Sequence, residues 1–151
     1  MTIALFKHTI WIAQPREHVF DFFVDFDQAA RWRSYVTSMK PLEPGPVRAG
    51  SRIHVTMDLA GTDYVFDLQV LTCERPALWR HRTDEADVRG AIEYRFEPEG
   101  DGTRVTMRCD VVPVGLYGWL SVPLLWLRRG QSYRDQLPRL KRVLEEDRGH
   151  A

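Results

Sequence analysis

The chain has 151 residues, long enough for one domain (residues 1–151) with its own core, and it carries 21 basic and 21 acidic residues. This balance provides no overall charge that would attract nucleic acid, so we expect no nucleic-acid partner. Two cysteines outside any metal-ligand spacing indicate free thiols in a cytoplasmic protein, with no metal, no cofactor and no disulfide framework.

The N-terminal part predicts one strand followed by two short helices. Leu5–Ile12 is rich in residues that favour β structure, and Pro15 suits the first turn of a helix over 15–24. A second short helix is expected to end near Arg31. The residues around this end are expected to cover one end of the core: Trp32 and Tyr35, beside Arg31 and Arg33.

The middle of the chain predicts six strands separated by turn signals such as Glu43-Pro44-Gly45-Pro46. Apolar and polar residues alternate in four of them, which is typical of strands with one buried face. Short turns between consecutive strands favour an antiparallel meander. His54 and Asp58 share the polar face of their strand and are expected to form a surface pair. The predicted strands are Ser38–Leu42, Gly50–Leu59, Tyr64–Leu71, Leu78–Thr83, Gly90–Glu97 and Thr103–Val111.

Leu116–Glu146 is the segment that predicts a long helix. Gly130 and Pro138 predict either a kink in this helix or two shorter helices. The apolar run Val112–Leu127 is too short to span a bilayer, so we expect a buried helix start and no stable membrane insertion. Weak contact with a membrane surface is the alternative. The apolar face of the helix, with residues three and four apart, is formed by Trp126, Gly130, Tyr133, Leu137, Leu140 and Leu144.

This order of elements indicates an α+β fold in which the long helix lies across a curved antiparallel sheet. The inner face of the sheet is expected to be almost uncharged, with the Tyr64 and Tyr94 hydroxyls and the Cys109 thiol among its polar groups. Such a lining suits an apolar ligand oriented by one or two hydrogen bonds; the alternative is a filled core with little cavity. The predicted inner face comprises Ile53, Val55, Met57, Tyr64, Phe66, Leu68, Val70, Ile92, Tyr94, Phe96, Val105, Met107, Cys109 and Val111.

In the strand Leu78–Thr83 the alternation leaves the orientation open. If Trp79 points inward, His81 does too and becomes the best acid–base candidate. If instead Leu78 points inward, two cations line the interior and could hold a ligand carboxylate or enolate: Arg80 and Arg82. In a third interpretation the polar members of this strand face solvent and one apolar side chain is buried.

Five stretches carry a resemblance to a known family: Ile12–Phe20, Trp32, Gly50–Ile53, Tyr94–Thr106 and Arg139–Lys141. In these stretches the chain resembles the START-like, or Bet v 1-like (SRPBCC), superfamily, and more narrowly its polyketide cyclase/dehydrase and lipid-transport group. The resemblance implies a helix-grip fold, with about seven strands wrapped on the C-terminal helix around a cavity. Members bind lipids, hormones and aromatic compounds, and some cyclise polyketides, so the fold alone does not select a function.

The first hypothesis is that a monomer or homodimer binds or transports a small hydrophobic ligand, such as a lipid, polyketide or aromatic, in an internal apolar cavity. The second is a polyketide aromatase/cyclase-like enzyme with His81, Arg82 and Tyr94 as catalytic candidates. A third is a partner-binding module that acts through Trp119–Leu127. The expected ligand-binding residues are Trp32, Tyr35, Met57, Tyr64, Phe66, Leu68, Trp79, Tyr94, Met107, Cys109, Trp126, Tyr133 and Leu137.

Overall fold

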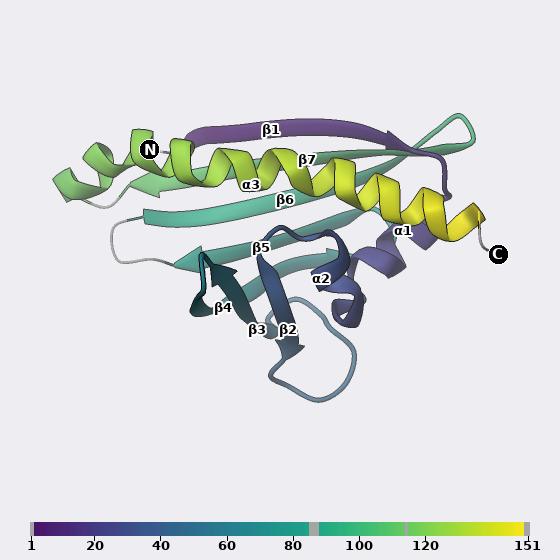
Figure 1. The fold of residues 1–151 in the computed structure, drawn as a ribbon, viewed down its shortest axis with the longest axis horizontal. Helices are drawn as coiled ribbons and strands as arrows, with labels where there is room; N and C mark the ends of the chain where they lie inside the picture. The colour runs from purple at the N-terminus through teal and green to yellow at the C-terminus, as the bar shows by residue number, and fades with distance from the viewer. Residues whose placement is uncertain (1, 85–87, 114, 150–151) are drawn as a thin grey trace.

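A computed structural model describes residues 2–84, 88–113 and 115–149. Seven strands form one curved antiparallel sheet, and a long C-terminal helix runs along it (Figure 1). The predicted α+β helix-grip fold is therefore confirmed. The elements are β1 (Ile3–Ile12), α1 (Arg16–Phe23), η1 (Phe26–Gln28), α2 (Ala29–Trp32), β2 (Val36–Pro41), β3 (Arg52–Leu59), β4 (Thr62–Glu74), β5 (Leu78–Asp84), β6 (Val88–Glu99), β7 (Gly102–Pro113) and α3 (Gly115–Gly149).

The strands lie in the order β1-β7-β6-β5-β4-β3-β2. Strands β2 to β7 therefore form the predicted meander, and β1 pairs with the β7 edge. Alternation predicts the inner face of β7 correctly, because its four apolar residues Val105, Met107, Cys109 and Val111 are at most 3 % exposed. The inner face of this sheet and the helices packed on it form the core.

Helix α3 is continuous from Gly115 to Gly149, with Pro123 and Pro138 inside it, so the alternative of two shorter helices is wrong. Hydrogen bonds join its C-terminal half to the corner between β1 and α1 and to the region of α2. Hydrogen bonds as well as apolar packing therefore hold the helix against this end of the sheet. The contacts are Gln14 Nε2 to the Leu144 carbonyl at 3.2 Å, Lys141 Nζ to the Trp11 carbonyl at 2.7 Å, the Ala13 amide to Glu145 Oε1 at 3.2 Å, and Arg31 to Asp147 at 2.9 Å.

The first turns of α3 are exposed, which corrects the expected buried helix start. Leu116 is 74 % exposed and Leu120 is 67 % exposed. These turns are exposed because this end of the helix extends past the ends of the strands and has no sheet beneath it (Figure 1). Within the described ranges, none of the helices combines the length and the hydropathy that a bilayer span requires.

Gly102 begins β7 where the chain of β1 passes very close to it. A Cβ atom added at Gly102 would lie 2.3 Å from the Ile12 carbonyl oxygen and 2.6 Å from Trp11 Cζ2. We expect Gly102→Ala to lower the free energy of unfolding by about 1–3 kcal/mol, since backbone must move to admit the methyl group. Urea denaturation of the purified variant measures this change.

The matched control is Gly90→Ala in the neighbouring strand β6. Its added Cβ would meet Thr83 Oγ1 at 3.6 Å, an ordinary contact distance. Alanine also restricts the unfolded chain more than glycine does, so this variant is expected to be unchanged or slightly more stable. Equal stability losses in the two variants would contradict the close approach at Gly102.

Candidate functional site

An aromatic cluster fills the end of the interior that α1, η1 and α2 cover. Phe23 of α1 lies at its centre, 1 % exposed, with its ring 4.6 Å from the Tyr94 ring and 5.4 Å from the Trp32 ring, centroid to centroid. Further ring contacts join Phe23 to Trp79 and Phe96. Helices α1 and α2 are short, so their stability depends on burying these rings against the inner faces of β5 and β6.

Arg33 is the charged residue that this cluster buries. It follows α2 directly, where the chain turns into extended structure, and it is 6 % exposed. Its guanidinium carbon lies 4.2 Å from the Trp32 ring centroid and 4.8 Å from that of Phe23. Both ring faces attract the cation, but neither replaces the hydrogen bonds that water would make.

Two buried N–H donors in this cluster lack a partner among the described residues: Arg33 Nε and Trp32 Nε1. Burial lowers the pKa of Arg33, while the nearby Tyr94 hydroxyl partly opposes that change; no carboxylate in the described part of the chain contributes. Arginine stays protonated even so, because a guanidinium is too basic to lose its proton in a protein. The cluster therefore offers a cation and two free N–H groups, which is a donor set that an oxygen acceptor would satisfy.

Two internal hydrogen bonds fix the other polar side chains of the cluster. The Tyr94 hydroxyl donates to Gln136 Oε1 on α3 at 2.9 Å, which joins the sheet to the helix. Trp79 Nε1 donates to His81 Nδ1 at 2.9 Å. Burial raises the pKa of Tyr94, and Arg33 partly opposes that rise. Tyr94 thus remains a neutral hydroxyl beside a buried cation.

His81 is buried and neutral. Burial, with a smaller contribution from the Arg33 charge, lowers its pKa from 6.5 to about 3. Its Nδ1 already accepts the Trp79 hydrogen bond, so a proton there would break that bond as well. His81 therefore accepts a hydrogen bond in the folded state and is poorly suited to exchange protons near neutral pH.

This pKa predicts an acid-sensitive stability. Between pH 6.5 and 3 the unfolded chain takes up a proton at His81 that the folded protein does not. The free energy of unfolding should therefore fall as pH falls through this range, with His81 contributing up to about 1.4 kcal/mol per pH unit. His81→Asn, whose Oδ1 can still accept from Trp79, should show a shallower slope in urea denaturation at several pH values. His54→Asn, on the outer face of β3, is the control. If His81→Asn leaves the slope of stability against pH unchanged, this assignment is wrong.

The orientation of β5 is now settled. Trp79 is 0 % exposed and His81 is 5 % exposed, so both point inward, as in the first of the two orientations. Arg80 and Arg82 are exposed. The interpretation in which the polar residues of this strand face solvent is wrong for His81, and Arg82 is not in the enclosed interior.

Most of the expected ligand-binding residues lie in the interior or at its margin. Tyr35 and Tyr64 do not, because they are 53 % and 43 % exposed. Tyr64 keeps the same face of β4 as Phe66, whose ring lies 5.7 Å from its own, so the expected alternation holds there and the expected burial is wrong. The side chains of Trp126 and Tyr133 lie outside the described residues. Those buried are Trp32, Leu68, Trp79, Tyr94, Met107, Cys109 and Leu137, and those partly buried are Met57 and Phe66.

Arg33 and Gln136 are not among the site residues that the sequence predicts, and the sequence predicts an almost uncharged interior. Arg33 corrects that description. The sequence does contain a signal for the burial of Arg33. This residue directly follows Trp32, in a stretch expected to cover the core, so aromatic rings are available for its guanidinium to pack on. Gln136 stands beside Leu137 of the predicted apolar face, so it is near enough to that face to reach the sheet.

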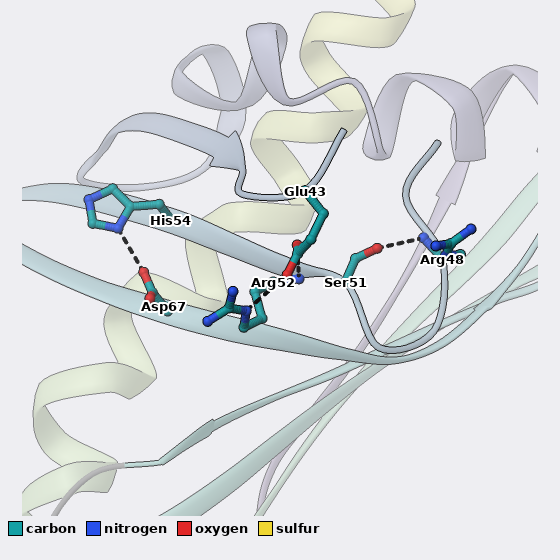
Figure 2. Close-up of polar contacts among 6 residues, drawn as sticks. All are labelled: Glu43, Arg48, Ser51, Arg52, His54 and Asp67. Atoms are coloured by element: carbon teal, nitrogen blue, oxygen red, sulfur yellow. Dashed lines mark hydrogen bonds and ion pairs between the residues drawn. The ribbon is translucent and has the colours of Figure 1, made fainter. Parts of the chain in front are cut away.

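Polar residues on the outer face of β3 and β4 form ordinary surface pairs (Figure 2). His54 Nδ1 lies 2.7 Å from Asp67 Oδ1 on the neighbouring strand, whereas Asp58 accepts from the Gly61 amide in its own turn. The expected His54–Asp58 pair is therefore wrong, because the cross-strand neighbour is closer. Among the described residues, no group of three histidine, cysteine, aspartate or glutamate side chains is placed to hold a metal ion.

A family model described as polyketide cyclase / dehydrase and lipid transport matches residues 4–145. No curated protein matches the chain. Among solved structures, the Zhui aromatase/cyclase from Streptomyces sp. R1128 has a TM-score of 0.77 at 16 % identity, over 96 % of this chain and 94 % of that chain.

Two further solved structures share the fold. Ara h 8.0201 has a TM-score of 0.69 at 12 % identity, over 96 % of this chain and 99 % of that chain. A START superfamily protein from Mycobacterium smegmatis has a TM-score of 0.72 at 16 % identity, over 96 % of this chain and 97 % of that chain. At these identities the likeness establishes a common architecture.

Proposed function

Because the chain belongs to the polyketide cyclase/dehydrase and lipid-transport family, we propose that it binds one small hydrophobic molecule between α3 and the inner face of the sheet. The body of the ligand would contact apolar side chains. One oxygen of the ligand, as a carboxylate, phenolate or enolate, would accept hydrogen bonds from the buried cluster around Arg33. The ligand is thus an apolar acid or a carbonyl compound that can become anionic.

The observation that carries this proposal is the buried Arg33 cation with an unpartnered Nε. An arginine with no carboxylate beside it is costly to bury, and a ligand oxygen would offset that cost. The neighbouring Trp32 Nε1 is a second free donor, whereas the Tyr94 hydroxyl would donate to a ligand only by giving up its hydrogen bond to Gln136. This arrangement favours an oxygen-bearing ligand over a plain hydrocarbon.

The strand register supports one direction for the proposed ligand. Gln136 meets Tyr94, so the part of α3 before Gln136 runs toward the sheet end where β6 and β7 carry Ile92, Cys109 and Val111. These side chains are apolar and face inward. The apolar body of the ligand would lie on this side, with its oxygen at Arg33.

Native mass spectrometry of gently purified protein tests the proposal. The panel contains matched pairs: 2-naphthoic acid with its methyl ester, and lauric acid with 1-dodecanol. We expect a one-to-one complex with an acid of the panel, or with an acidic molecule retained through purification, and weaker complexes with the neutral partners. Protein that retains nothing and binds no member of the panel would contradict the proposal.

A second candidate function is an aromatase/cyclase-like enzyme. It is favoured by the placement of the Tyr94 hydroxyl beside the Arg33 cation, since both could stabilise an enolate or phenolate oxygen that develops during ring closure. His81 would accept a hydrogen bond rather than act as the base, because its pKa is about 3. Turnover of a poly-β-ketone substrate that Tyr94→Phe slows without weakening binding would support this function over simple carriage.

A further inference from the structure

His81 is a buried polar side chain to which the proposed binding of an apolar acid gives no role. It lies on the inner face of β5 and is 5 % exposed. Its ring stacks on the Tyr94 ring at a centroid distance of 6.5 Å, with 30° between the two planes. Trp79, two residues earlier on the same strand, brings its Nε1 to 2.9 Å from His81 Nδ1. Both neighbouring rings are at most 1 % exposed, so packing holds the imidazole in one orientation.

The hydrogen bond from Trp79 fixes which ring nitrogen of His81 carries the proton. An indole N–H can only donate, so Nδ1 is the acceptor and carries no hydrogen. In a neutral imidazole the single proton is then on Nε2. The low pKa of His81, about 3, keeps the ring neutral at physiological pH. His81 therefore presents one uncharged N–H donor to the interior and has no free acceptor.

Nε2 of His81 makes no hydrogen bond to any residue that the structure describes. Arg33 Nε and Trp32 Nε1 are unpartnered and fully enclosed, whereas His81 Nε2 is not among the fully enclosed unpartnered atoms. It therefore keeps some accessible surface, and a ligand atom can reach it. A ligand that covered Nε2 without offering an acceptor would take this N–H away from water and leave it unsatisfied, which costs free energy.

The strand register places His81 beside the proposed body of the ligand. His81 pairs with Ile92 on β6, and Ile92 pairs with Cys109 on β7. These three side chains face inward and are at most 8 % exposed. Tyr94, which lies beside Arg33, is two residues after Ile92 on the same face of β6. A ligand with its acidic oxygen at Arg33 would therefore pass the His81 row along its apolar body.

We infer that His81 Nε2–H donates to a second, uncharged oxygen of the ligand, and that Trp79 is the positioning residue that fixes the tautomer. This inference rests on the proposed function and narrows its ligand class. The ligand would be an acid that carries a ketone or ester oxygen along its apolar body. When a methylene group replaces that oxygen, the donor stays unsatisfied, which is expected to weaken binding by about tenfold or more.

Nitrogen-15 NMR of the ligand-free wild-type protein tests the tautomer without any assumption about the ligand. We expect the His81 ring to carry its proton on Nε2 and none on Nδ1. Trp79→Phe removes the indole donor, so this variant should populate both tautomers. The inference is overturned if the wild-type ring carries its proton on Nδ1, or if Trp79→Phe keeps the Nε2 tautomer alone.

Isothermal titration calorimetry tests the contact itself with acids that differ in one ketone. Lauric acid is compared with 5-, 7- and 9-oxododecanoic acid, and 6-ethyl-2-naphthoic acid with 6-acetyl-2-naphthoic acid. The wild type should bind at least one keto acid about tenfold more tightly than its plain partner. In His81→Asn, whose Oδ1 can still accept from Trp79 but which lacks the Nε2–H group, this ratio should fall to about one. His54→Asn, on the outer face of β3, should keep the wild-type ratio.

These measurements separate failure of the inference from failure of the proposed function. If plain acids bind and no keto acid binds more tightly, or if the preference survives in His81→Asn, the His81 contact is wrong and acid binding at Arg33 still stands. If none of the acids binds, the proposed function is wrong and the inference fails with it. A keto acid that binds where its plain partner does not would support both.

Discussion

Replacing Arg33 with methionine is expected to stabilise the protein and to weaken its binding of acidic ligands. The free energy of unfolding should stay unchanged or rise by about 1–3 kcal/mol, because the variant no longer buries a cation without a counter-charge. Affinity for an acid such as 2-naphthoate should fall by about 10- to 100-fold, the range expected for losing one charge-assisted hydrogen bond. Urea denaturation and isothermal titration calorimetry measure the two effects.

Arg33→Met should raise stability and lower affinity because Arg33 is desolvated and has no carboxylate partner among the residues that the structure describes. Its guanidinium lies against the rings of Trp32 and Phe23, and its Nε makes no hydrogen bond to a described residue. Methionine fills similar volume on these rings without the charge. A residue that costs stability and serves binding is expected at a functional site.

Arg80→Met is the matched control, since Arg80 is exposed on β5. It should change the free energy of unfolding by less than about 0.5 kcal/mol and leave ligand affinity unchanged. If Arg33→Met were destabilising by several kcal/mol and bound acids as well as wild type does, Arg33 would be a structural residue and the proposed oxygen site would be wrong.

The largest loss of stability is expected from Phe23→Ala. This variant should lower the free energy of unfolding by about 3–5 kcal/mol, because it removes a buried ring and leaves a cavity among side chains that cannot collapse into it. The Phe23 ring contacts the Tyr94 and Phe96 rings at centroid distances of 4.6 Å and 5.2 Å and supports the Arg33 guanidinium. Thermal and urea denaturation both measure the loss.

Phe22→Ala is the control for Phe23→Ala, one residue earlier on the same helix. Phe22 is only partly buried at the margin of the core, and the exposed Arg31 guanidinium lies 5.8 Å from its ring centroid. We expect it to lower the free energy of unfolding by about 1 kcal/mol. Comparable losses at the two positions would show that the aromatic cluster does not centre on Phe23.

Alternation of apolar and polar residues predicted the inner face of the long strands well. It succeeded in β7 because one face of that strand packs on the core along its whole length. It did not predict the exposure of Tyr64, which lies at the start of β4 next to the turn at Gly61, where no helix buries the inner face of the sheet. An apolar residue near such an edge keeps the pattern but loses the burial.

Other features depended on partners that sequence spacing does not reveal. The orientation of Trp79 was open because both faces of its short strand carry a large apolar residue; pairing with Tyr94 on β6 decides it. Arg33 lies between a helix and a strand, where no periodicity applies, so its burial was not predicted. The exposed Leu116 and Leu120 were expected to be buried because hydropathy does not show where the sheet ends.

The most direct test of the central claim is an NMR titration that follows two side-chain N–H signals, those of Arg33 Nε and Trp32 Nε1. The protein is titrated with 2-naphthoic acid and, separately, with its methyl ester. If a ligand oxygen binds at this cluster, the acid moves both signals downfield and the ester moves them much less. If the acid binds, as judged by shifts of backbone amides, while both side-chain signals stay in place, the buried arginine does not receive the ligand.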